Sequence, residues 1–191
     1  MGKVISVVVV AVALLSVSAC EVGRTDESPP PDVRPVADSA PYLCDLVPES
    51  AFRDVTGLTA QLNSDWNGPQ TDNGLCSARP ESEPFAPLGV RWSYNEGTRI
   101  LQTQQENWAD LSHQPLPPEL GKGLAGHHRS SGPTGRPNYV IALFRCGEKR
   151  PWISIAFVSA VRGRDVVQDM FDFMRIAQQR FGEIHECTPR P

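Results

Sequence analysis

The densest group of chemically capable side chains lies in GKGLAGHHRSSG, residues 121–132, which contains Lys122, His127, His128 and Ser130. A lysine among glycines can bind phosphate, and histidines can ligate a metal ion. A serine near a histidine and an acid can act as a nucleophile. Each of these sites requires its residues in a particular order.

The order that each site requires is missing. The stretch lacks the G-x-x-x-x-G-K-[ST] pattern of a phosphate-binding loop, and no G-x-S-x-G elbow surrounds Ser130. Adjacent histidines on a strand point to opposite faces of a sheet, so only one of His127 and His128 can join a given set of metal ligands. We therefore expect an exposed, glycine-hinged loop, with no catalytic residue, no metal and no cofactor.

Cys20 stands at the boundary between two very different segments. Upstream, residues 1–19 contain one cation, Lys3, followed by an apolar run to Ala19 that is shorter than the roughly 20 residues of a spanning helix. The pattern predicts an export signal over 1–19. Its end, VSAC, resembles the lipobox of bacterial lipoproteins, whose cysteine sulfur takes a diacylglyceryl group and becomes the mature N-terminus. That resemblance implies acylation of Cys20, for example with palmitate, and a location on the outer face of the cell membrane.

Two other interpretations of the N-terminus stay open. An ordinary signal peptide cleaved after Ala19 also fits the sequence SVSA. The opening MGKVIS fits the myristoylation template, with Gly2 and Ser6 in place, although the long apolar run behind it favours export.

The other cysteines indicate disulfides. Cys44, Cys76, Cys146 and Cys187 are even in number in a chain that we expect to be exported, and four cysteines allow three pairings. We favour Cys44 with Cys76, around a loop rich in Gly, Asn and Pro, and Cys146 with Cys187, which would pin the C-terminal tail to a strand. Each bond should contribute about 3 kcal/mol. A zinc site is the alternative, but no C-x-x-C pair is present.

Composition divides the rest of the chain into a stalk and one domain. Residues 21–41 hold five prolines, five acids and two arginines, so they bury too little apolar surface to offset their ordering entropy. We expect a disordered stalk over 20–41 and a single globular domain over 42–191. The net charge of the whole chain is −4, most of it from the stalk. The near-neutral domain gives no electrostatic case for nucleic acid as a partner.

The first part of the domain predicts two helices around three strands. VPESAFRDVTG is typical of a short helix that ends at Gly57. LTAQLN, GLCSARP and LGVRWSYN predict strands separated by turn residues. TRILQTQQENWADL predicts a second helix, with Thr98 as its cap.

The second part predicts three more strands and a last helix. The strands are LAGHHRS, NYVIALFRC and PWISIAFVSAV, of which the last two form a hairpin. Asp165 caps a helix that carries an apolar stripe and ends at Gly182. The order helix, three strands, helix, three strands, helix predicts an α+β fold, in which helices pack on a twisted antiparallel sheet stabilised by two disulfides.

Three aromatic residues are candidates to line a ligand cleft: Trp92, Tyr94 and Trp108. The competing interpretation places both tryptophans in the core. A non-enzymatic binding module for a small ligand is therefore our first hypothesis for function. The alternatives are a docking or regulatory partner of a membrane protein and, less favoured, a cell-envelope hydrolase that uses Ser130.

Several short motifs together resemble a family of actinobacterial lipoproteins built on a domain of unknown function. CDLVPESAFRDVTG follows the lipobox and acidic stalk, NGLCSA precedes the strand VRWSYN, and LGKGLAGHH precedes a late cysteine. The resemblance covers roughly residues 42–187, and the chain departs from it at Ala78, where the family usually has Trp. It implies an envelope location and an α+β architecture, with no assigned activity, and a partner in the membrane itself through the N-terminal anchor.

Overall fold

A seven-stranded antiparallel sheet is the framework on which the helices pack. The computed structural model describes residues 34–108, 112–128 and 135–191. The predicted export signal, Cys20, most of the predicted stalk and Ser130 lie outside the described residues. The elements are, in order, β1 (Tyr42–Leu43), β2 (Val47–Pro48), α1 (Glu49–Thr56), β3 (Asn63–Asn67), β4 (Asn73–Arg79), β5 (Leu88–Ser93), α2 (Gly97–Asn107), β6 (His113–Pro115), the 3₁₀ helix η1 (Pro118–Leu120), β7 (Lys122–His127), β8 (Asn138–Leu143), β9 (Arg145–Cys146), β10 (Trp152–Phe157), α3 (Val166–Ile184) and β11 (Pro189–Arg190).

The strand order in the sheet is β3-β4-β5-β10-β8-β7-β6, and every neighbouring pair is antiparallel. The α+β class and the antiparallel sheet are therefore confirmed, and β8 and β10 form the predicted hairpin. The predicted order of elements is only partly correct, because β6 adds a fourth sheet strand after α2. The pairs β1–β2 and β9–β11 are also additional. β6 is a three-residue strand in a proline-rich segment, which is too short to show an alternating pattern.

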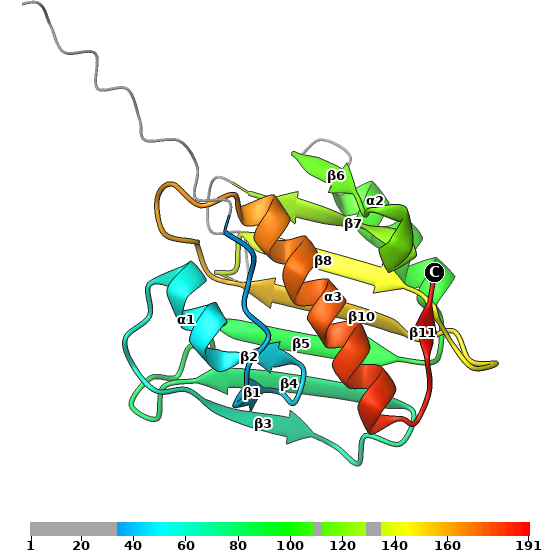
Figure 1. Cartoon of the computed structure of the whole chain (residues 1–191), viewed down its shortest axis with the longest axis horizontal. Coiled ribbons are helices and arrows are strands. Elements are labelled where there is room, and N and C mark those ends of the chain that lie inside the picture. The colour runs from blue at the N-terminus through cyan, green and yellow to red at the C-terminus, as the bar shows by residue number, and fades with distance from the viewer. Residues whose placement is uncertain (1–33, 109–111, 129–134) are drawn as a thin grey trace, which may run out of the picture.

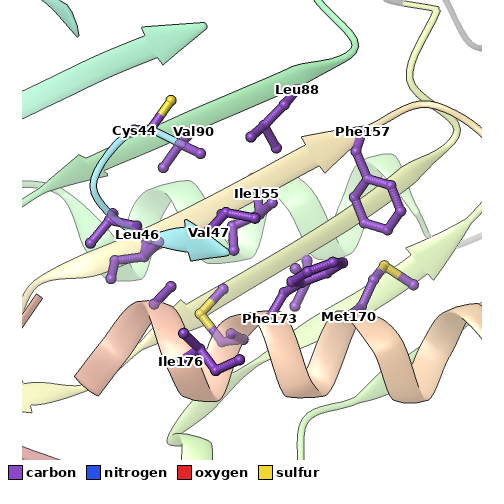
Figure 2. Close-up of a cluster of buried hydrophobic side chains, with 14 of the residues drawn as sticks. Cys44, Leu46, Val47, Leu88, Val90, Ile155, Phe157, Met170, Phe173 and Ile176 are labelled. Atoms are coloured by element: carbon purple, nitrogen blue, oxygen red, sulfur yellow. The ribbon is translucent and has the colours of Figure 1, made fainter. Parts of the chain in front are cut away.

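The main core lies between one face of the sheet and two helices, α1 and α3. Figure 1 shows α3 running diagonally across the strands, with α1 beside it on the same face. Figure 2 shows Phe173 and Met170 of α3 packed toward Ile155 and Phe157 of β10. All four side chains are fully buried. Burial of each side chain of this size stabilises the fold by about 1.5–3 kcal/mol.

The opposite face of the sheet is only half covered. Leu101 of α2 forms a second, smaller core with Leu124, Ile141 and Trp152, over β7, β8 and β10. No helix among the described residues packs on the same face of β3, β4 and β5. Antiparallel sheets tolerate such an arrangement because the side chains on the two faces alternate along each strand.

The ends of the helices confirm some capping predictions and correct others. Asp165 accepts a hydrogen bond from the Gln168 backbone N–H at 3.1 Å, and Gly57 ends α1 in the left-handed conformation, both as predicted. The N-cap of α2 is Glu96 and not Thr98. α3 continues through Gly182 to Ile184, so the predicted end at Gly182 is wrong.

Gly182 has a packing role in place of a capping role. A Cβ atom there would lie 2.6 Å from the backbone oxygen of Cys187 and 2.6 Å from Cδ of Pro189. The glycine therefore lets the C-terminal tail lie against α3.

A second correction concerns LTAQLN, of which only Asn63 belongs to a strand. β3 lies further along the chain, where Trp66 donates a hydrogen bond to the Asp45 carboxylate at 2.8 Å.

Both disulfides join the cysteines that the sequence favoured. Cys44 is bonded to Cys76, with their Cα atoms 5.8 Å apart, and Cys146 is bonded to Cys187, at 5.3 Å. The first bond is fully buried and fixes the β1–β2 turn on β4. The second attaches the C-terminal tail to β9.

The folded domain begins earlier than residue 42. Residues 34–41, here called the N-terminal arm, run between α1 and α3 (Figure 1). Val36 is part of the main core, and its N–H donates to the Asp172 carboxylate at 3.2 Å. Arg164 donates to the backbone oxygen of Arg34 at 3.1 Å and forms a buried ion pair with Asp169. These contacts from α3 and the loop before it order a segment whose composition alone predicted disorder.

Removal of the N-terminal arm should therefore destabilise the domain. We expect fragment 42–191 to have a free energy of unfolding about 3 kcal/mol lower than fragment 34–191, because it loses the burial of Val36 and a hydrogen bond to the buried Asp172 carboxylate. Urea denaturation followed by tryptophan fluorescence measures the difference. Coincident unfolding curves would show that the arm contributes nothing.

Candidate functional site

His127, which ends β7, is held by contacts within the fold. Nδ1 of His127 lies 2.6 Å from Oδ1 of Asn138, and the Asn138 amide donates to the backbone oxygen of Val158 at 2.6 Å. Asn138 is fully buried. These contacts connect β7, β8 and the segment after β10, so they account for His127 without a ligand. Ser130 lies outside the described residues.

The two glycines around Lys122 also have a packing explanation. A Cβ atom on Gly123 would lie 1.9 Å from the backbone oxygen of Ile141, and one on Gly121 would lie 2.5 Å from that of Leu143. Gly121 also has a φ of 87°. Glycines at these two positions allow the backbone of residues 121–123 to lie close to β8, and this packing explains the GKG sequence.

The three aromatic candidates do not share a cleft. Trp92 is 2% exposed and lies in the main core, where its ring contacts those of Tyr94, Phe181 and His185 with centroids 4.8–5.4 Å away. Trp108 lies on the other face of the sheet and stacks on Tyr139 at 6.1 Å. The sheet separates Trp92 from Trp108, so the predicted cleft of Trp92, Tyr94 and Trp108 does not form.

Among four hollows lined by described residues, the one with the greatest volume lies at the C-terminal end of α3. This C-terminal groove, of about 700 Å³, exceeds the hollows beside α1 and α2, which are about 520–550 Å³. It lies between α3, η1 and the tail after α3. The lining residues are Glu119, Leu120, Arg175, Gln178, Gln179, Gly182, Glu183, Glu186, Cys187, Thr188 and Pro189.

Local covalent and hydrogen-bonded contacts fix the walls of this groove. The Cys146–Cys187 bond and the pairing of β11 with β9 hold the tail in place. On the opposite wall, the buried Gln178 amide donates to the backbone oxygen of Leu120 at 2.8 Å and so ties η1 to α3. The groove is therefore preformed by contacts that join three separate parts of the chain.

Hydrogen-bond acceptors dominate the free polar groups of the groove. Arg175 is paired with Asp172 at 2.6 Å, and Glu183 is paired with Arg180. Within the described chain, the carboxylates of Glu119 and Glu186 have neither an ion pair nor a hydrogen bond. The groove thus offers free carboxylates beside the amide and hydroxyl groups of Gln179 and Thr188.

Glu186 adopts a backbone conformation that usually belongs to glycine. Its φ is 52°, directly after α3, and the Cys187 N–H donates to the Gly182 oxygen at 2.8 Å, which is the hydrogen bond of a Schellman motif. A non-glycine residue in the left-handed region loses about 1–2 kcal/mol. No sequence signal identified this position, because the residue that helix-ending rules expect there is Gly or Asn.

The aromatic cluster beside the groove contains a histidine whose environment favours the neutral imidazole. Partial burial, together with the nearby Lys149 ammonium, lowers the pKa of His185 below its ordinary value. The His185 ring packs on Phe181 with centroids 4.0 Å apart. His185 therefore contributes packing at the end of α3, and the negative charge of the groove comes from its glutamates.

The described ranges contain no cluster of three or more His, Cys, Asp or Glu side chains that could hold a metal ion. Within the same ranges, no helix has the length and apolar character needed to cross a bilayer. Comparison with known proteins gave no match, whether to a family model, a curated protein or a solved structure.

Because Gly123 lies so close to β8, a single added methyl group at this position should strongly reduce the stability of the domain. We expect Gly123→Ala to lower the free energy of unfolding by about 2–3 kcal/mol, because the new Cβ overlaps the Ile141 carbonyl. Gly147→Ala is the matched control, since a Cβ there meets no atom within 4 Å and only its φ of 64° is unfavourable. Its expected effect is about 1 kcal/mol. Equal effects of the two substitutions in thermal unfolding would contradict the close-approach explanation.

Proposed function

We propose that this chain is an exported, lipid-anchored envelope protein whose domain binds a small polar ligand non-covalently in the C-terminal groove. The observation that carries the proposal is Glu186, whose carboxylate lines the groove from a left-handed backbone conformation and has no partner among the described residues. Strained residues tend to be retained where their side chains have a function.

The chemistry of the lining defines the class of ligand. Free carboxylates, side-chain amides and a hydroxyl group are suited to a ligand that donates hydrogen bonds, such as a polyhydroxylated or amino-bearing molecule. The preformed walls reduce the ordering entropy lost on binding. The catalytic constellation of a hydrolase has no support in the environment of His127, which is engaged with the buried Asn138.

The proposed location rests on the N-terminal sequence and the cysteines. An apolar run that ends in VSAC, with Cys20 at the predicted cleavage point, supports lipidation. Two disulfides support an oxidising compartment. The resemblance to actinobacterial lipoproteins supports the same location, with the lipid anchor on the outer face of the membrane.

Docking to a membrane protein is the second candidate function. The uncovered sheet half on the α2 side favours it, since Leu75 at its centre is 42% exposed. A docked protein partner would be recovered with the chain in the extraction described below.

Lipidation can be tested directly at Cys20. We expect radiolabelled palmitate fed to the native cells to enter the wild-type protein and to be absent from Cys20→Ser, because only the cysteine sulfur can accept the diacylglyceryl group. Labelled protein is measured after immunoprecipitation and gel separation. Cys20→Ser that still carries label would contradict lipidation at this residue, and unlabelled wild type would contradict the anchor altogether.

The groove can be tested through its strained glutamate. We expect native mass spectrometry of the gently extracted full chain to reveal a bound small molecule, which Glu186→Gly should lose while gaining about 0.5–1 kcal/mol in free energy of unfolding. Glu96→Gly is the control for backbone strain. It replaces another left-handed glutamate, with a φ of 58°, at the start of α2 and away from the groove, and the ion pair with Arg99 that it removes is exposed and contributes little stability.

The two variants separate strain from ligand binding. Both should be as stable as the wild type or more so, and only Glu186→Gly should be empty. An equally occupied Glu186→Gly protein would rule out the groove, and a bare wild-type chain would contradict ligand binding. A wild-type chain that comes away with another protein would favour docking.

A further inference from the structure

A second site is suggested by arginines on the uncovered half of the sheet. The open half-face consists of the side chains of β3, β4 and β5 that lie on the same side as α2. It includes Asp65 of β3, Ser77 and Arg79 of β4, and Gly89 and Arg91 of β5, placed by the alternation and register of these strands. Three arginines gather here, since Arg136, just before β8, reaches over Gly89.

Arg136 is half-buried and has no carboxylate partner among the described residues. Its Nε donates to the backbone oxygen of Ala86 at 2.8 Å, and its guanidinium lies 5.8 Å from the centre of the Phe85 ring. Burial lowers the pKa of Arg136, as expected for a cation without a counter-ion. Glu81 and Glu83, in the same loop as Phe85, form no ion pair with it.

The space that Arg136 occupies depends on Gly89. A Cβ atom on that glycine would lie 2.7 Å from Nη1 and 3.1 Å from Cζ of Arg136. The guanidinium thus packs directly against the backbone at Gly89, and both its Nη groups are without a hydrogen-bond partner among the described residues. A planar fork held in this way matches the geometry of carboxylate and phosphate oxygens.

Arg91 follows Gly89 on the same face of β5. Two residues of a strand span about 7 Å, so the backbone of Arg91 lies about that far along β5 from Gly89, over which the Arg136 guanidinium lies. Arg91 is exposed, lies 6.0 Å from the centre of the Trp152 ring and has no ion pair within the described residues. The carboxylate of Asp65 is two strands from Gly89 in register, or about 10 Å.

The geometry points to an oxyanion-binding site on the open half-face, in which Arg91 and Arg136 bind the carboxylate or phosphate group of an anionic ligand. Phe85, which is 42% exposed beside Arg136, would contact the apolar part of that ligand. The site is on the other face of the sheet from the core side of α3 and is independent of the C-terminal groove. A soluble anion and a lipid headgroup carry the same chemistry, and the experiment distinguishes them.

The test uses the full chain in zwitterionic detergent micelles and inorganic phosphate as the probe. At constant ionic strength, phosphate should shift the arginine Nε–H NMR signals of Arg91 and Arg136 in a saturable manner and leave the signal of the exposed Arg162 unchanged. Arg91→Gln and Arg136→Gln should each weaken the apparent affinity at least tenfold, and Arg162→Gln should not. Arg136→Lys, which keeps the charge without the fork, should also weaken binding, and Arg91→Gln covers the case in which changes at Arg136 impair folding.

A second titration replaces phosphate with phosphatidylglycerol added to the micelles. Saturable shifts of the same two signals with lipid alone would assign the site to a headgroup, and shifts with phosphate would assign it to a soluble anion. Unchanged signals in both titrations would overturn the proposal. So would shifts that Arg162 shares equally.

Discussion

The packing of α3 across the sheet is the constraint on which the rest of this structure depends. Its apolar face closes the main core through Met170, Phe173 and Phe181, all fully or almost fully buried. The polar groups at its N-terminal end hold the arm through Asp172, and Gly182 at the other end admits the C-terminal tail. A shift of this helix would therefore disturb the core, the start of the domain and the groove together.

The buried ion pair between Arg164 and Asp169, near the start of α3, fixes a conformation without a large gain in stability. Burial, together with the nearby carboxylates of Asp172 and Asp165, raises the pKa of Asp169 in spite of the Arg164 guanidinium beside it, so desolvation and repulsion outweigh the attraction. Arg164 also donates from Nη2 to the backbone oxygen of Arg34. The ion pair therefore serves mainly to hold the arm in position, and it adds little to the free energy of unfolding.

The sequence predicted the features that depend on local signals. The cap at Asp165, the stop at Gly57, the β8–β10 hairpin and both disulfide pairings follow from residue types, periodicity and counting. Features that depend on distant partners were missed. Val36 is a single apolar residue among prolines and acids, and its burial requires Asp172, 136 positions away. Gly182 resembled a helix stop because its actual neighbour, Pro189, is defined only by the tertiary fold.

The candidate sites likewise depend on distant partners that local sequence signals do not reveal. The sequence offered Trp92 and Trp108 as candidates to line a ligand cleft, with core positions as the competing interpretation. Their separation depends on which face α2 covers, and periodicity does not encode that choice. The groove was missed because Glu186 takes a position where glycine is the expected signal. Arg136 was missed because its partner glycine is 47 residues away in sequence, at Gly89. Only the pairing of β5 with β10 and β8 brings the two together.

Alternation along β5 keeps the two proposed sites apart. Trp92 points into the core beneath α3, whereas its neighbour Arg91 points to the open half-face, so adjacent residues serve opposite faces. The arm leaves the domain at the start of α3, and the groove lies at its other end, about 28 Å along a helix of 19 residues. With the proposed lipid anchor at Cys20, the chain would be tethered at one end of α3 and would present the groove at the other. A ligand could then reach the groove without displacing the tether, and the arginine site would be free to engage an anion on a separate face.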